Sequence, residues 1–264
     1  ANDGDIISTW NDKSGNNNDA SGAGEYLKNI WGNNNNHSLV NFTSSGSEYF
    51  SIPLTTSEMN GSGTFIIVTQ PDQTSSDKRL LSCRNSSLRG FVIDTNFDEW
   101  RFLEAGNSKV FPADTSKVIL IGDLDNNGGY TFKDGVEQTS TTSDSSIRET
   151  SVNITLGKDG VNDTKYYDGK IAEVLIYDRS LTTEERFAIE RYLATKYLIN
   201  VENETISEQG TRVSPQIDLS PISTVSSTSI KWSSVPINQG VITDGVNDYI
   251  NLNTSLPSDG TFTI

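Results

Sequence analysis

The clearest alternation of hydrophobic and polar positions lies at residues 169–199. An apolar, β-branched run from Ile171 to Tyr177 stands between turn residues, which is typical of a strand buried on at least one face. A helix follows at once, because Thr182 precedes Glu185 by three residues and the two can form a capping box. Helical spacing predicts an apolar stripe of Ala188, Ile189, Tyr192, Leu193 and Tyr197, with Glu184, Arg186, Glu190 and Arg191 turned to water.

Upstream of this unit the pattern changes to short strands separated by Gly, Asn, Asp and Ser clusters. The predicted strands are residues 48–52, 64–69, 79–82, 90–94, 100–103, 117–121, 130–133, 151–157 and 170–177. The Asn-rich residues 16–38 form the longest predicted irregular segment, and a loop of that length is usually a binding loop or a mobile one. Many short strands with one helix predict an all-β sandwich of two antiparallel sheets.

Three phrases of the sequence support a family resemblance. They are GKIAEVLIYDRSLTTEER at residues 169–186, WNDKSGNNNDA at residues 10–20 and the hairpin YTFKDGVEQ at residues 130–138. Together these phrases resemble the LamG-like jellyroll, a concanavalin A-like lectin/glucanase domain, as found in bacterial surface adhesins and phage fibre proteins. The resemblance implies a two-sheet antiparallel jellyroll sandwich with one C-terminal helix. It implies little chemistry, because the same sandwich serves lectins, adhesion modules and glycanases.

An internal repeat indicates the domain organisation. Residues 40–42, 48–52 and 63–67 are echoed at nearly the same spacing by residues 241–243, 248–252 and 260–264, and residues 217–232 resemble the family's opening strand. We therefore expect a jellyroll lacking its first strand at residues 1–200, a linker at residues 201–213 and an incomplete second LamG-like repeat at residues 214–264. The second repeat either begins an ordinary tandem domain or donates its opening strand to an open sheet edge.

Composition limits the partners. A formal net charge of -15 argues against nucleic acid and anionic membrane, whose phosphates would be repelled. Cys83 is the only cysteine, so the chain forms no intrachain disulfide. No apolar run approaches the roughly 20 residues that span a bilayer, and the N-terminus lacks a signal-peptide pattern. We expect an extracellular, cell-surface or virion location and, as partners, surface glycans or neighbouring protein subunits.

Several oxygen-rich patterns could hold a structural Ca²⁺ ion. Asp123-x-Asp125-x-Asn127-Gly128 matches part of a calcium loop, but its flanks read as strands, so a plain polar hairpin is the alternative. Asp12 opens a second alternation of oxygens, for which a Ser-Gly-Asn turn is the alternative. The family resemblance implies that acids in the last strand help hold calcium, although Ala172 replaces the first of them. Glu173 is the second candidate metal ligand, because alternation places this acid on one strand face with Ile171, Leu175 and Tyr177. A solvated position at the sheet surface, or pairing with Lys or Arg, is its alternative.

The sequence offers little for catalysis. Glycanases of this fold class place paired acids on one strand, and no such spacing occurs, since Glu99 and Glu104 differ by five positions. His37 is the only histidine and lies in an Asn-rich loop, where a surface position is expected, so no triad can be assembled around it except by chance. We expect that the domain is not an enzyme.

Binding requires less machinery than catalysis. Sugars are held by aromatic faces and by amide or carboxylate side chains, and Trp31, Asn33, Tyr166 and Tyr167 are the ligand-binding candidates in this chain. Core packing is the alternative for each ring. The predicted function is a non-catalytic glycan-binding or adhesive module of a large tandem-repeat surface or virion protein. The alternatives are a structural spacer or decoration subunit, and an accessory domain of a glycanase.

Overall fold

The computed structural model describes residues 1–28, 31, 37–59, 63–87, 90–104, 107–124, 130–138, 150–160 and 165–202. The chain divides into two compact units, Ala1–Ser207 and Glu208–Ile264. Residues 203–264, which contain most of the predicted linker and all of the predicted second repeat, lie outside the described residues.

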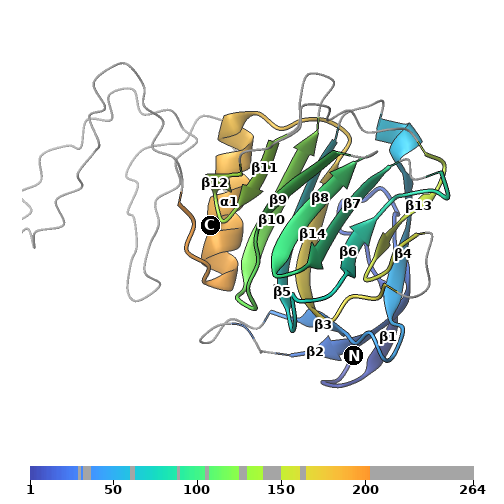
Figure 1. Ribbon diagram of the computed structural model, residues 1–264. Coiled ribbons are helices and arrows are strands. Elements are labelled where there is room, and N and C mark those ends of the chain that lie inside the picture. Colours follow the sequence, from blue (N-terminus) through green and yellow to red (C-terminus); the bar gives the residue numbers. More distant parts are fainter. Residues whose placement is uncertain are drawn as a thin grey trace, which may run out of the picture. The chain divides into compact units, whose positions relative to one another are not determined.

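Strands dominate the first unit, and one helix follows them (Figure 1). The strands are β1 (Ile6–Trp10), β2 (Ala20–Leu27), β3 (Leu39–Phe42), β4 (Tyr49–Thr55), β5 (Gly63–Pro71), β6 (Lys78–Ser82), β7 (Phe91–Asn96), β8 (Glu99–Glu104), β9 (Asn107–Pro112), β10 (Val118–Leu124), β11 (Tyr130–Lys133), β12 (Val136–Glu137), β13 (Asn153–Leu156) and β14 (Gly169–Tyr177). A 3₁₀ turn, η1, spans Thr56–Met59, and the helix α1 spans Thr183–Tyr197.

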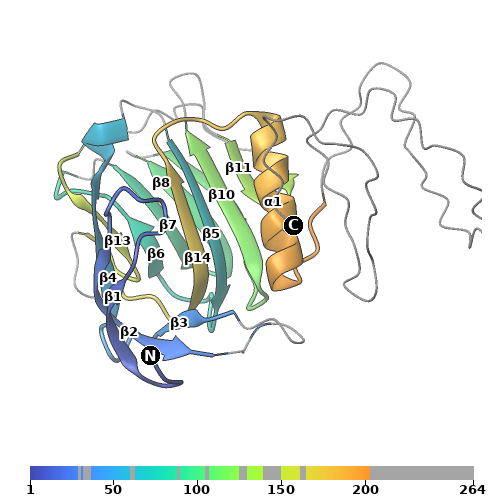
Figure 2. The same cartoon turned by 180° about the vertical axis from the view of Figure 1, so that it is seen from behind.

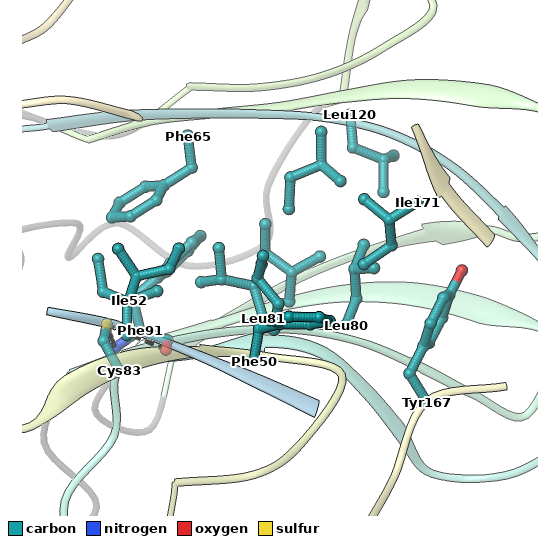
Figure 3. Packing of buried hydrophobic residues seen from close by; sticks show 14 of the residues in the cluster. Phe50, Ile52, Phe65, Leu80, Leu81, Cys83, Phe91, Leu120, Tyr167 and Ile171 are labelled. Atoms are coloured by element: carbon teal, nitrogen blue, oxygen red, sulfur yellow. Dashed lines mark hydrogen bonds between the residues drawn. The ribbon is translucent and has the colours of Figure 1, made fainter. Parts of the chain in front are cut away.

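All strand pairs of the ladder are antiparallel, in the order β12-β11-β10-β5-β14-β3-β2-β4-β13-β6-β7-β8-β9, with β1 paired to β2. The ladder folds over on itself, so that β14, β5, β10 and β11 form one layer and β4, β13, β6, β7, β8 and β9 form the other (Figures 1 and 2). Figure 3 shows Phe65, Leu120 and Ile171 of the first layer facing Phe50 and Leu81 of the second. The predicted all-β sandwich is confirmed.

Helix α1 covers the outer face of the first layer. Leu193 and Tyr197 pack there with Ile66 of β5 and Ile119 of β10, and both views show the helix against β10 and β11 (Figures 1 and 2). The predicted capping box is present, because the Glu185 amide donates to the Thr182 Oγ1 atom at 3.2 Å. Among the described helices none is long and apolar enough to cross a membrane.

The predicted orientation of this helix is wrong in part. Its buried side chains are Arg186, Phe187, Glu190, Leu193 and Tyr197, while Ala188 is exposed and Tyr192 is 52% exposed. Arg186 Nη1 pairs with Glu190 Oε1 at 3.0 Å, and its guanidinium lies 3.7 Å from the ring centroid of Phe132. The ion pair and the cation–π contact make burial of these two charges possible, so the core-facing side includes them.

Every strand predicted from the sequence is present, but β1, β2, β3 and β9 were not among the predicted strands. Strand β2 lies within residues 16–38, which were expected to be irregular. Its sequence, ASGAGEYL, is rich in small residues because β4 passes very close: a Cβ atom added at Gly22 would lie 2.0 Å from the Tyr49 carbonyl oxygen. Small residues therefore mark a close approach of two backbones here, rather than a loop.

Candidate functional site

The sheet opens between β14 and β4. Strand β14 pairs with β3 only over residues 169–171, and after a β-bulge it continues to Tyr177 with β5 on one side alone. Strand β4 pairs with β2 only over residues 49–51 and then continues to Thr55. In the part of the chain that the structure describes, no strand pairs with the remaining edge of β14 or with the β2 side of residues 52–55.

A cavity of about 580 Å³ occupies this opening. Its apolar wall includes Trp10, Ala20, Ile52, Leu54, Leu156, Val174 and Ile176. Its polar and charged lining consists of Asn11, Asp12, Lys13, Ser14, Asn16, Asn18, His37, Ser38, Glu173 and Lys196. Small-molecule sites in proteins usually have volumes of about 300–1,000 Å³ and this mixed lining, so the cavity is the candidate functional site.

One side of the rim is a tight polar turn after β1. Asp12 accepts hydrogen bonds from the amides of Ser14, at 2.7 Å, and Asn18, at 3.0 Å. The Asp12 amide donates to Asp19 Oδ1 at 2.7 Å. The hydrogen bonds from Ser14 and Asn18 hold the pKa of Asp12 below its usual value. Hydrogen bonds from backbone amides to the Asp12 and Asp19 carboxylates thus hold the turn together. The side chains of Lys13 and Asn16 remain exposed beside the cavity.

The opposite side of the rim is formed by Glu173 and the end of α1. Lys196 Nζ lies 2.9 Å from Glu173 Oε2, and the Tyr197 hydroxyl donates to the same carboxylate at 2.8 Å. The alternation of the sequence predicted that Glu173 shares a face with Ile171, but Ile171 belongs to the core between the sheets. The β-bulge after Ile171 turns Glu173 to the helix side, where the alternative prediction, pairing with a lysine, is confirmed.

The family model described as "Concanavalin A-like lectin/glucanases superfamily" matches residues 44–185, which is more than half of the chain. The chain belongs to this superfamily. No curated protein gives a significant match.

Solved structures of botulinum neurotoxin binding domains are similar to this superfamily member. The serotype C1 binding domain has 13% identity and a TM-score of 0.53, and the match covers 71% of this chain and 52% of that chain. The serotype D/C VPI 5993 domain has 12% identity, a TM-score of 0.52 and the same coverage. The DC domain in complex with rat synaptotagmin II has 11% identity, a TM-score of 0.50 and coverage of 71% and 51%. The chain spans about half the length of these structures, and at such identities the similarity shows the fold alone.

Asp12 and Glu173, the candidate calcium ligands, both have partners within the folded chain, and calcium binding by them stays a prediction. Both oxygens of Asp12 accept hydrogen bonds within the turn, and Glu173 is paired with Lys196 and Tyr197. Within the described ranges, no three His, Cys, Asp or Glu side chains gather as metal ligands. The partial calcium loop is flanked by strands β10 and β11, as predicted, and its residues 125–129 lie outside the described residues.

Two of the predicted ligand-binding rings are buried, which corrects the expectation that they present a face to sugar. Trp31 is 3% exposed and lies edge-on to Tyr197, with ring centroids 6.2 Å apart. Tyr167 is fully buried, and its hydroxyl lies 2.7 Å from Thr69 Oγ1. Tyr167 packs in the core between the sheets, and Trp31 packs in the core under α1. Core packing, the alternative prediction, is therefore correct for both rings.

Tyr166 and Asn33 have different outcomes. Tyr166 is half-buried and forms a bridge with Arg79, outside the cavity lining. Asn33 lies outside the described residues. The ligand-binding roles of both remain predictions.

Of the cavity lining, only Asp12 and Glu173 were predicted as site residues, and Trp10, His37 and Lys196 are among those that were not. Trp10 is half-buried against Phe50 and also lines the cavity. His37 is half-buried, with its ring centroid 5.4 Å from that of Tyr197. Lys196 comes from the last turn of α1. These residues are far apart in the sequence, so only the folded chain brings them to one site.

A second polar cluster lies on β6, β7 and β8, and its charges are mutually paired. Arg79 contacts Asp94 and lies 3.4 Å from Asp159, and Arg101 Nε lies 2.7 Å from Asp94. Lys165 and Asp77 extend the network at 2.5 Å. Burial raises the pKa of Asp94, although the two arginines oppose that shift. This network ties strands together and lies outside the cavity lining.

Proposed function

We propose that this domain is a non-catalytic glycan-binding or adhesive module of a large tandem-repeat surface or virion protein, located outside the cell. The single observation that carries the proposal is the cavity, which has an apolar wall and a polar rim. A sugar has the same two-sided character, because its C–H surface is apolar and its hydroxyls donate and accept hydrogen bonds.

The cavity offers suitable groups for each side of a sugar. The half-buried Trp10 indole provides an aromatic surface at the wall. Lys13, Asn16 and Ser38 are exposed at the rim and provide hydrogen-bond donors and acceptors. The hydrogen bonds around Asp12 order the rim before a ligand arrives, which reduces the entropy that binding must overcome.

The acids at the cavity favour binding over hydrolysis. A glycosidase needs one carboxyl with a raised pKa as the acid and a second carboxylate across the bond. Asp12 has a lowered pKa, and Glu173 is held by Lys196 and Tyr197. The similar solved domains are described as binding domains, which agrees with this proposal.

A glycan array probed with the purified chain tests the proposal. We expect at least one glycan class to bind, and Asn16→Ala to raise its Kd by about 2- to 10-fold, since one hydrogen bond contributes about 0.5–1.5 kcal/mol. Asn200→Ala is the matched control, because Asn200 is exposed and does not line the cavity. No bound glycan, or equal losses in the two variants, would favour the spacer function instead.

A further inference from the structure

The lining of the cavity shows that a strand edge borders it. All residues from Ala172 to Tyr177 of β14 line the cavity, although their side chains point to two faces. Val174 and Ile176 pack against the core between the sheets, whereas Leu175 and Tyr177 pack against the core under α1. Consecutive residues of a strand can all border one cavity only when its backbone edge faces that cavity.

The opening therefore has the geometry of an acceptor for one more strand. The free side of β14 carries N–H and C=O groups that no described strand pairs, and across the cavity Ile52 and Leu54 line it from β4. Its inner side is apolar, with Val174, Ile176 and Leu54 only half-buried. Its outer side carries the polar groups of His37, Glu173 and Lys196, next to Leu175 and Tyr177.

We propose that this opening binds an extended polypeptide strand in which apolar and polar residues alternate. The strand hydrogen-bonds to the free edge of β14, directs its apolar side chains to the inner side and leaves its polar side chains on the outer side. A segment with this period fits because successive side chains of a strand point to opposite faces. The proposal goes beyond glycan binding, since it concerns the free edge of β14 and the apolar inner side of the opening and not the rim turn.

The sequence of the chain supplies a suitable probe. The peptide PQIDLSPI, residues 215–222, alternates Ile217 and Leu219 with Asp218 and Ser220. The protein to be titrated is the full chain carrying Ile217→Asp and Leu219→Asp. These substitutions remove the apolar side chains of its own residues 215–222, so that this segment does not compete with the added peptide. Calorimetric titration measures the Kd of this peptide and of PQDISLPI, which has the same composition and the opposite alternation.

Two further peptides test the backbone ladder. One is N-methylated at Ile217 and Leu219, and the other at Asp218 and Ser220, because alternate amides of a strand point to opposite sides. We expect PQIDLSPI to bind, and we expect PQDISLPI and at least one methylated peptide to bind about tenfold more weakly or not at all. No binding by PQIDLSPI overturns the proposal, as does equal binding by PQDISLPI or by both methylated peptides.

A variant of the protein locates the site. Leu54→Lys places a charge at the half-buried inner side of the opening and should weaken peptide binding about tenfold. Leu198→Lys is the control, because Leu198 is 53% exposed and lies outside the cavity lining. Circular dichroism verifies that both variants fold, and equal affinity in both would overturn the assignment to this opening. Peptide binding without glycan binding would retain this inference and refute the proposed function, and the reverse result would do the opposite.

Discussion

Replacing Asp134 by asparagine tests the electrostatics of the β11–β12 hairpin. Asp134 and Gly135 form its turn in left-handed conformations, with φ values of 50° and 84°. Asp134 Oδ1 accepts from the Ile119 amide at 2.8 Å, and the Asp134 amide donates to the Ile119 carbonyl oxygen at 3.0 Å. Asparagine retains both hydrogen bonds, tolerates this backbone conformation and is favoured before glycine in such turns.

The magnitude follows from the pKa of the Asp134 carboxyl. Burial raises it from 3.8 to about 6. Because the folded state holds the proton more tightly, the carboxyl contributes its full stability below about pH 4, and this contribution is lost as the pH rises through about 6. The shift corresponds to about 3 kcal/mol at about 1.4 kcal/mol per unit, and solvent screening of the half-buried group reduces this to about 1–2 kcal/mol.

We therefore expect Asp134→Asn to raise the free energy of unfolding by about 1–2 kcal/mol at pH 7.5 and to change it little at pH 4. Urea denaturation at the two pH values measures both quantities. Asp114→Asn is the matched control, because the hydrogen bonds from Ser116 lower the pKa of exposed Asp114, so this variant should not be stabilised at pH 7.5. An Asp134→Asn gain that is absent at pH 7.5, or equal at both pH values, would refute the reasoning.

Three further substitutions test the packing by urea or thermal denaturation. Arg186→Ala should lower the free energy of unfolding by about 3–5 kcal/mol because it leaves buried Glu190 unpaired. The double variant Arg186→Leu/Glu190→Leu should recover most of that loss. A small loss for Arg186→Ala alone would mean that Glu190 is hydrated. Gly22→Ala should cost roughly 1–3 kcal/mol through overlap with the β4 backbone, and a neutral result would contradict the close approach. Trp31→Ala should lower the free energy of unfolding by about 3–5 kcal/mol, because it removes a buried side chain from the core. Unchanged stability would mean that the Trp31 ring is exposed.

Local patterns predicted the elements whose causes lie in adjacent residues. The capping box at Thr182, the turn at Asp134 and Gly135, and strand β14 each depend on a few neighbours in sequence, and all three are present. Features that depend on distant residues were not predictable in this way. The face of α1 is set by the ring of Phe132 on β11, and the small residues of β2 are explained by the backbone of β4.

The candidate site shows the same division. Asp12 and Glu173 were selected singly from the sequence, and both line the cavity. Their hydrogen-bond partners and the β-bulge before Glu173 are properties of the folded chain, so their chemistry could not be read from spacing. Trp31 has polar neighbours in sequence, yet Tyr197, which comes from the far end of α1, helps bury it. Exposure is decided by such contacts and not by adjacent residues.

His37 allows the most direct measurement of whether glycans enter the cavity. It is the only histidine of the chain, and it lines the cavity beside the ring of Tyr197. Its imidazole ¹H–¹³C signals can therefore be followed without ambiguity while a glycan selected on the array is titrated into the labelled protein. We predict a saturable shift of the His37 signals with the same Kd as calorimetry gives. Saturation of the protein by the glycan with the His37 signals unmoved would contradict binding at this cavity.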